Sequence, residues 1–186
     1  MKISKANFTL RPWRPEDYVS LAEQANNKAI WNNVRDSFPH PYTEKDAQEF
    51  IETTVRKPSL LDFAIEIEGK AVGGVGFVPG EDVERLSAEV GYWLGEKYWN
   101  KRIASDAVET AVRYIFQHTE LIRIFATIYE YNHASMKVLE HAGFTRLCIL
   151  HKAAIKNGQI IDLHAMNRRI LPEDHQQFLP TGISKG

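Results

Sequence analysis

The chain has 186 residues, of which 44% are hydrophobic and 25% are charged, as in an ordinary globular domain with a sizeable core. The formal net charge of −1 provides no overall attraction for nucleic acid or an anionic membrane, so neither is an expected partner. The longest apolar runs fall short of the ~18 residues of a membrane span, and the N-terminal residues lack a signal-peptide core. The cytoplasm is therefore the expected location.

The first half of the chain alternates between strand and helix patterns. Residues 7–13 form an expected strand, and residues 15–17 begin a helix because proline suits a first turn and acids complement the helix dipole. A short second helical piece is expected at 30–31. The proline-rich residues 36–42 indicate a loop, and a near capping box then begins a helix over 43–56.

Strand patterns dominate the second half, with two intervening helices. The expected elements are strands at 60–68, 71–78 and 86–94, a helix at 103–118, a strand at 121–129, a helix at 135–141, and strands at 144–153 and 159–167. The Asn157-Gly158 pair between the last two strands favours a type I′ hairpin turn.

This order predicts one mixed α/β (α+β) domain, with a twisted mixed sheet of about seven strands and about four flanking helices. The domain is expected over residues 1–170. From residue 171 the composition becomes polar with proline and glycine, which indicates a C-terminal tail over 171–186.

The lone cysteine and the histidines suggest no special chemistry. Cys148 excludes an intramolecular disulfide, and because it lies in an apolar run we expect a buried, inert thiol. The seven histidines show no paired metal-ligand spacing such as His-x-x-x-His, so no metal is expected.

Two segments carry the most informative pattern. Residues 87–107 indicate a strand, a short loop and a helix start, where unpaired N–H groups and the helix dipole favour a bound phosphate. Residues 131–144 indicate a helix that is capped by Asn132 and ended by Gly143.

Together these segments resemble the two signature blocks of the GNAT superfamily of acetyl-CoA-dependent N-acetyltransferases, and most closely the branch acting on ribosomal-protein N-termini. The resemblance extends more weakly from Leu10 to about Asn167. It implies acetyl-CoA as co-substrate, and a fold in which the fourth and fifth strands, here 86–94 and 121–129, splay apart to admit the coenzyme arm. The implied acceptor is a protein N-terminus or a small amine such as an amino acid, a polyamine or an antibiotic, and its amine attacks the thioester directly. The protein itself is expected to be a monomer or a homodimer.

In that family, a loop of pattern Gln/Arg-x-x-Gly-x-Gly/Ala wraps the coenzyme pyrophosphate; the aligned residues here are Trp99, Asn100, Lys101, Arg102, Ile103 and Ala104. Ala104 fits the pattern, whereas Trp99 and Arg102 depart from it. Glycine in place of Arg102 would let the backbone approach phosphate. A side chain is tolerated there if φ is negative, and the guanidinium and Lys101 would add phosphate partners. The alternative is a charged helix start with decayed coenzyme affinity.

The resemblance also implies how the thioester is held. Backbone N–H groups of the fourth strand polarise its oxygen, here from Tyr92, Trp93 and Leu94, although the segment could be a plain core strand. Asn132 would hold the pantetheine arm in addition to capping its helix.

Three further assignments concern catalysis and the acceptor. Glu89 is the candidate base, or alternatively a member of a structural ion pair or a solvated strand face. Ser135 is the candidate proton donor to sulfur, because Leu139 stands where many relatives have a tyrosine; a simple capping-turn hydroxyl is the alternative. The loop residues that would contact the acceptor, unless they serve local packing, are Phe38, His40 and Tyr42.

Three classes of function therefore remain from the residues and the resemblance. The first is an acetyl-CoA-dependent N-acetyltransferase. The second is a coenzyme-binding module with weak or lost catalysis, and the third is an interaction domain that keeps only the fold.

Overall fold

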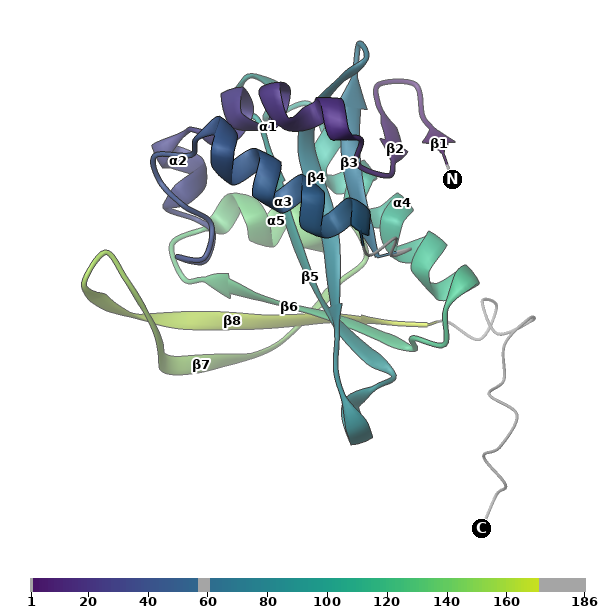
Figure 1. Cartoon of the computed structure of the whole chain (residues 1–186). Helices are drawn as coiled ribbons and strands as arrows, with labels where there is room; N and C mark the ends of the chain where they lie inside the picture. The colour runs from purple at the N-terminus through teal and green to yellow at the C-terminus, as the bar shows by residue number, and fades with distance from the viewer. Residues whose placement is uncertain (1, 57–60, 171–186) are drawn as a thin grey trace.

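The computed structural model describes residues 2–56 and 61–170. Their strands form one eight-stranded sheet in the order β1-β2-β3-β4-β5-β6-β8-β7. Only the β5–β6 pair is parallel. The strands, labelled in Figure 1, are β1 (Ile3–Ser4), β2 (Thr9–Arg11), β3 (Asp62–Ile67), β4 (Lys70–Pro79), β5 (Ser87–Leu94), β6 (Arg123–Tyr129), β7 (Thr145–Lys156) and β8 (Gln159–Arg169).

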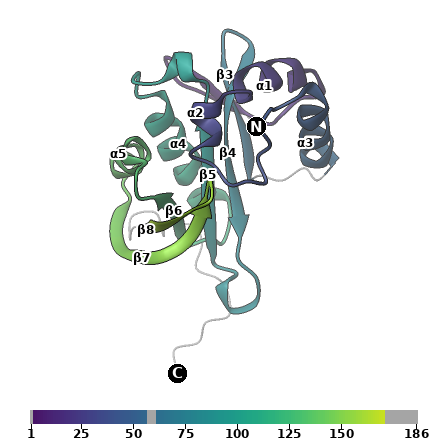
Figure 2. The ribbon, with the colours of Figure 1, turned by 90° about the vertical axis from the view of Figure 1, so that its left-hand side faces the viewer.

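Helices cover both faces of the sheet. Figure 2 shows α1 and α3 on one side of the central strands and α4 and α5 on the other. Two separate apolar clusters match this division, one beneath each helix layer. The α-helices of the described residues are α1 (Tyr18–Ala25), α2 (Lys28–Trp31), α3 (Glu44–Arg56), α4 (Ile103–His118) and α5 (His133–His141).

The predicted fold class is confirmed, with small differences at the periphery. An eighth strand exists because Ile3–Ser4 pairs with β2. The fifth helix exists because Asn26 is the C-cap of α1 and Asn27 caps the next helix, its side chain accepting hydrogen bonds from the backbone of Ala29 and Ile30. The predicted capping box is present: Thr43 and Asp46 exchange side-chain-to-backbone hydrogen bonds at the start of α3.

The predicted divergence of two central strands is also confirmed. β5 pairs with β6 only over three residues, Ser87 to Glu89, whereas β4 pairs with β5 as far as Leu94. β8 follows β6 along its whole length. Beyond Glu89 the two strands therefore separate and leave a gap within the sheet.

The C-terminal hairpin contains one confirmed prediction and one wrong one. Asn157 and Gly158 both have positive φ, at 52° and 74°, as a type I′ turn requires. Cys148, expected to be buried, is exposed. The reason is that its apolar run lies on β7, the outermost strand, where Leu147 and Ile149 are exposed too. The expected tail over 171–186 lies outside the described residues.

A buried ion-pair cluster ties the start of α1 to the sheet. The Arg11 side chain is only 2% exposed and donates two hydrogen bonds to the Asp17 carboxylate, at 2.6 and 2.7 Å. It also donates to Glu66 on β3. Burial alone would lower the pKa of Arg11, but the hydrogen bonds and charges of Asp17 and Glu66 raise it overall, so the guanidinium stays charged.

Removing one partner of this cluster should destabilise the fold strongly. Asp17→Ala leaves Arg11 buried with one remaining carboxylate, so we expect a loss near the lower end of about 3–5 kcal/mol in urea unfolding. The control is Lys45→Ala, which breaks the exposed Lys45–Glu49 pair and should change stability little. Equal effects of the two substitutions would contradict a structural role for the cluster.

Candidate active site

Strand β5 presents different chemistry on its two faces, because successive side chains alternate. Tyr92 faces the cluster beneath α4 and α5, whereas Trp93 faces the cluster beneath α1 and α3. Glu89 and Gly91 share the Trp93 face. Gly91 is exposed although β5 is a central strand, and a Cβ built there meets no atom within 4 Å. The open space above it, between Glu89 and Trp93, is called the Gly91 gap below.

On the α5 side, a short hydrogen bond links β5 to α5, the helix that follows β6 in the chain. The Tyr92 hydroxyl lies 2.6 Å from Ser135 Oγ and 3.1 Å from the Ser135 carbonyl oxygen. Burial raises the pKa of Tyr92, against the smaller opposing effect of the Ser135 hydrogen bond. The phenol therefore stays protonated and able to donate. The sequence predicts a role only for the Tyr92 backbone N–H, because nothing in the spacing links this side chain to Ser135, 43 residues away.

Asn132 is the N-cap of α5, as predicted. Its Oδ1 accepts a hydrogen bond from the Ser135 backbone N–H at 3.0 Å. Among the described residues, the amide nitrogen of Asn132 has no partner. That nitrogen can therefore donate to a ligand in the gap between β5 and α5, and its predicted contact with the pantetheine arm stays a prediction.

The loop before α4 has the backbone of a glycine-rich loop without its glycines. Asn100 and Arg102 both have φ of 60°, in the left-handed region. The sequence predicts that a side chain at Arg102 is tolerated only at negative φ, and that condition is not met. The left-handed conformation costs about 1–2 kcal/mol at this residue. Arg102 provides no side-chain cap to α4, so the first N–H groups of the helix are left for another acceptor.

Trp99 and Lys101 fold back onto the loop itself. The Trp99 indole N–H donates to the Leu94 carbonyl at 2.7 Å, which ties the loop to the end of β5. Lys101 Nζ donates to the Lys97 carbonyl at 3.0 Å. Of the remaining predicted loop residues, Ile103 is buried and begins α4, and Ala104 follows it in the first turn.

On the opposite face, Glu89 is held in an ion pair. Its Oε2 accepts a hydrogen bond from Arg35 Nη2 at 2.6 Å, and its Oε1 accepts one from Thr127 Oγ1 at 2.9 Å. The ion pair that the sequence left as an alternative is therefore present. Its side chain is nevertheless 22% exposed and borders the Gly91 gap.

The segment that carries Arg35 is fixed by residues of the C-terminal half. The Val34 carbonyl accepts hydrogen bonds from the Tyr129 hydroxyl, at 3.1 Å, and from Lys156 Nζ, at 2.9 Å. Lys156 also binds the Asp36 carboxylate at 2.6 Å and lies over the Trp31 ring. Sequence reasoning missed Lys156, because a lysine beside a hairpin turn normally faces solvent, whereas this side chain is 1% exposed.

The three predicted acceptor residues occupy different environments. Phe38 lies beside the site, with its ring 5.9 Å from that of Trp93 and 4.8 Å from that of Tyr42. His40 stacks on Trp31 at 5.6 Å. Tyr42 is buried, which raises its pKa to about 12. Its surroundings fit the packing alternative, and Phe38 has the position best suited to an acceptor contact.

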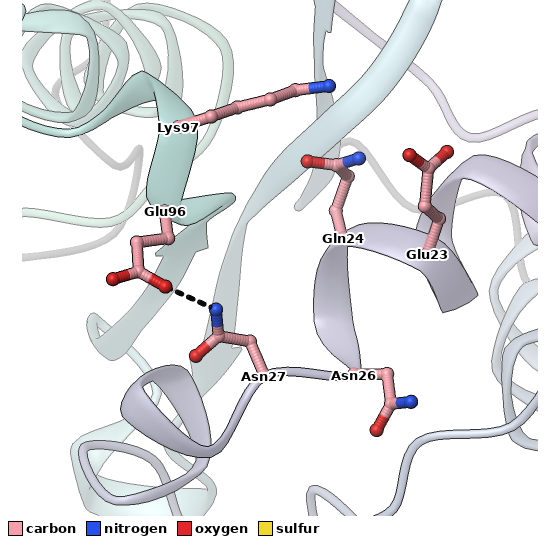
Figure 3. A pocket seen from close by; sticks show the side chains of 6 residues that line it. All are labelled: Glu23, Gln24, Asn26, Asn27, Glu96 and Lys97. Atoms are coloured by element: carbon pink, nitrogen blue, oxygen red, sulfur yellow. Dashed lines mark hydrogen bonds between the residues drawn. The ribbon is translucent and has the colours of Figure 1, made fainter.

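A polar cavity of about 380 Å³ lies where the end of α1 and the start of α2 meet the turn η3 (Glu96–Tyr98), and Figure 3 shows the side chains that line it. The Asn27 amide donates to Glu96 Oε2 across it at 2.6 Å. None of the predicted site residues lines the cavity, although η3 leads directly into the loop before α4. The lining residues are Glu23, Gln24, Asn26, Asn27, Glu96 and Lys97.

The described part of the chain lacks two kinds of feature. None of its helices is long and apolar enough to cross a membrane. Residues 2–56 and 61–170 contain no group of three or more histidine, cysteine, aspartate or glutamate side chains that could hold a metal. The expectation that the enzyme works without a metal stays a prediction.

The splayed central strands, the uncapped helix N-terminus beside them and the hydroxyls at the gap agree with the acyl-transferring fold that the resemblance implies. The chain belongs to the GNAT acetyltransferase family, whose "Acetyltransferase (GNAT) domain" model matches residues 7–145. It is accordingly an N-acetyltransferase.

Known proteins resemble the chain over most of its length. An SPbeta prophage-derived uncharacterized N-acetyltransferase of Bacillus subtilis (strain 168) is 26% identical over 158 residues, 84% of this chain and 86% of that protein. The structure of a ribosomal L7/L12 alpha-N-protein acetyltransferase in complex with coenzyme A gives a TM-score of 0.81 at 18% identity, covering 91% and 98% of the two chains. The structure of a microcin C7 self-immunity acetyltransferase in complex with acetyl-CoA and AMP gives a TM-score of 0.77 at 21% identity, covering 89% of this chain and 94% of that chain.

Proposed function

We propose that residues 1–170 form a cytoplasmic catalytic domain that transfers the acetyl group of acetyl-CoA to a primary amine by direct attack. The observation that supports this most is the arrangement around β5. The candidate proton donor, Ser135, lies on one face of the strand and the candidate base, Glu89, on the other. An acetyl group held in the gap between them would meet the amine from the Glu89 side and release its thiolate on the Ser135 side.

The chain has suitable groups for each part of acetyl-CoA. The first N–H groups of α4 suit the pyrophosphate, and the side chains of Lys101 and Arg102 supply positive charge beside them. The free amide nitrogen of Asn132 suits the pantetheine arm. When bound, acetyl-CoA supplies the thioester, whose oxygen the backbone N–H groups of residues 92–94 would polarise.

Proton transfers then follow from the residues. The amine must be neutral to attack, and the α-amino group of a peptide has a pKa of about 7.7–8.0, so a weak base such as Glu89 suffices for that kind of acceptor. The C–N bond forms, the C–S bond breaks, and the thiolate takes the Ser135 hydroxyl proton. The ammonium nitrogen loses two protons in all: one passes by way of Glu89 to solvent, and the other restores Ser135 through water.

Tyr92 fits this scheme as a positioning residue. When its hydroxyl donates to Ser135 Oγ, the Ser135 proton is left free to face the sulfur. When it donates to the Ser135 carbonyl instead, the serine proton points back at the phenol. The 2.6 Å contact with Oγ is compatible with either donor, so a thioester sulfur beside Ser135 would be needed to select the first arrangement.

The decisive experiment follows thiol release from acetyl-CoA with a panel of primary amines, alongside calorimetric titration of acetyl-CoA. Stoichiometric binding with amine-dependent thiol release is expected. Binding without turnover on any amine would support the alternative, a coenzyme-binding module with lost catalysis. Absence of binding would leave an interaction domain.

Neutralising the loop charges should weaken coenzyme binding. In Lys101→Ala/Arg102→Ala, the Kd of acetyl-CoA should rise and lose part of its salt dependence, since each charge-assisted contact contributes roughly 1.5–3 kcal/mol. Arg102→Gly is a companion variant that relieves the positive-φ strain while removing the charge. It should bind more weakly without unfolding earlier. Unchanged affinity in the double variant would remove both side chains from the site.

A further inference from the structure

The Gly91 gap is bordered by groups of both charges. Glu89 lies on one side, paired with Arg35, and Trp93 lies on the other with Phe38 against it. Gly91 pairs across the sheet with Gly76, which pairs in turn with Asp62 on β3, so the sheet surface here has two glycines side by side. An acceptor amine that reaches the gap therefore approaches an Arg–Glu pair directly.

Arg35 is held in place by its neighbours, yet its guanidinium can still bind a ligand. Its side chain is 70% exposed, and only Nη2 is engaged, on Glu89. Within residues 2–56 and 61–170, its other N–H donors have no partner. Its backbone is held on both sides by the contacts of Val34 and Asp36 with the hairpin. A flexible surface arginine would have none of these constraints. Because Arg35 is already held in place, little conformational entropy is lost when a ligand binds to it.

Both oxygens of Glu89 are already used, by Arg35 and by Thr127. Each carboxylate oxygen has a second lone pair, so an ammonium group can bind Glu89 beside Arg35. With a bare amine, the ammonium and the guanidinium would then share one negative charge. An amine with a neighbouring carboxylate would supply a second counter-charge, so that two ion pairs replace one.

Building on the proposed function, we propose that the acceptor is an amine with a carboxylate on the adjacent carbon, as in a free α-amino acid, and that Arg35 is its specificity-determining residue. The ammonium binds Glu89 Oε2 and the carboxylate binds the guanidinium of Arg35. The acceptor side chain then lies toward Trp93 and Phe38. A peptide N-terminus has a neutral amide in place of the carboxylate and cannot make the second ion pair.

The test compares amino acids with their own amides as acceptors, using thiol release at pH 8. Glycine, serine, methionine and lysine are suitable, because they sample small, polar, apolar and basic side chains against Trp93 and Asp62. A larger fraction of the amine is neutral in an amino-acid amide, because the amide lacks the carboxylate that favours the charged ammonium. The amide would therefore react faster if only the amine mattered. We expect instead that kcat/KM is roughly ten- to hundredfold higher for the best acid than for its amide.

Arg35→Gln should lower the ratio of kcat/KM for the acid to kcat/KM for its amide toward one, because KM for the acids rises. Arg35→Lys should restore part of that ratio. Arg85→Gln, a matched change at an exposed arginine on the turn η2 (Asp82–Glu84) side of the molecule, should leave the ratio as in the wild type. Amides or peptides with free N-termini used as well as the acids would overturn the proposal. So would an Arg35→Gln variant with an unchanged ratio.

Binding separates this proposal from the proposed function. The same amino acids and amides are titrated calorimetrically into the enzyme–coenzyme A complex. Acids that bind the wild type, and bind Arg35→Gln at least tenfold more weakly, support the assignment of Arg35 even if no amine is turned over, in which case the proposed catalysis fails alone. Equal binding of acids and amides, or binding of neither, would overturn the assignment.

Discussion

Replacing Ser135 with alanine should lower kcat about a hundredfold and leave acetyl-CoA binding nearly intact. The serine hydroxyl would stabilise negative charge that develops on sulfur as the thiolate leaves, an interaction made mainly in the transition state. General acid assistance is typically worth about 10²–10⁴-fold, and the upper part of that range requires full proton transfer. The substitution removes little volume from a partly exposed position, so the melting temperature should not move.

The measurement is kcat under conditions in which chemistry limits the rate, together with the Kd of acetyl-CoA and the melting temperature. A variant that binds normally and turns over at the wild-type rate would exclude the role. Thiolate would then have to leave unaided or take its proton from water.

Tyr92→Phe is the matched variant for the same hydrogen bond. If Tyr92 acts by orienting Ser135, its loss should lower kcat in the wild-type background and have little further effect in Ser135→Ala. If Tyr92 instead only packs β5 against α5, its loss should cost the same in both backgrounds. The double-mutant cycle therefore distinguishes positioning from packing.

Glu89→Gln should reduce turnover most at low pH. A base that acts on the ammonium form is needed where that form predominates, and is needed least above the pKa of the amine, where the neutral form is already abundant. Glutamine retains the size of the side chain, but its single amide oxygen can take the place of only one carboxylate oxygen, so it keeps the hydrogen bond from Arg35 or the one from Thr127. We expect a loss of about 10²-fold or more on the acidic side that narrows as pH rises through the amine pKa.

The pH profile of kcat/KM for one acceptor, measured for the wild type and for Glu89→Gln, tests the role of Glu89 as a base. A loss of equal size at every pH would show that Glu89 positions Arg35 or the acceptor and abstracts no proton. Arg35→Gln serves as the comparison, because it removes the ion pair without removing the carboxylate.

Local sequence signals predicted the elements because they depend on neighbours in the chain. The Thr43–Asp46 box, the Asn132 cap and the Asn157-Gly158 turn each satisfy backbone groups within a few residues, so their geometry follows from short-range chemistry. The edges of the fold were less predictable. Ile3–Ser4 is a strand only because β2 is beside it.

The predicted burial of Cys148 is wrong because burial also depends on neighbours in the sheet. An apolar run shows that side chains could be buried, but the order of strands in the sheet determines whether anything covers them. β7 is the outermost strand, and that position follows from pairing between β8 and β6 rather than from the composition of β7. Conversely, a lysine in a turn-flanking position became buried because the hairpin reaches the segment before Asp36.

The sequence by itself determined the family, the fold class and the separate candidates Glu89, Asn132 and Ser135, because each depends on a motif or on periodicity along the chain. Only the tertiary structure decided which groups these candidates meet. Tyr92 reaches Ser135 across 43 residues, and Arg35 reaches Glu89 across 54. Such pairs form because the helix layers and the splayed strands bring distant segments together. The short-range preferences of the chain do not determine contacts between residues so far apart in the sequence.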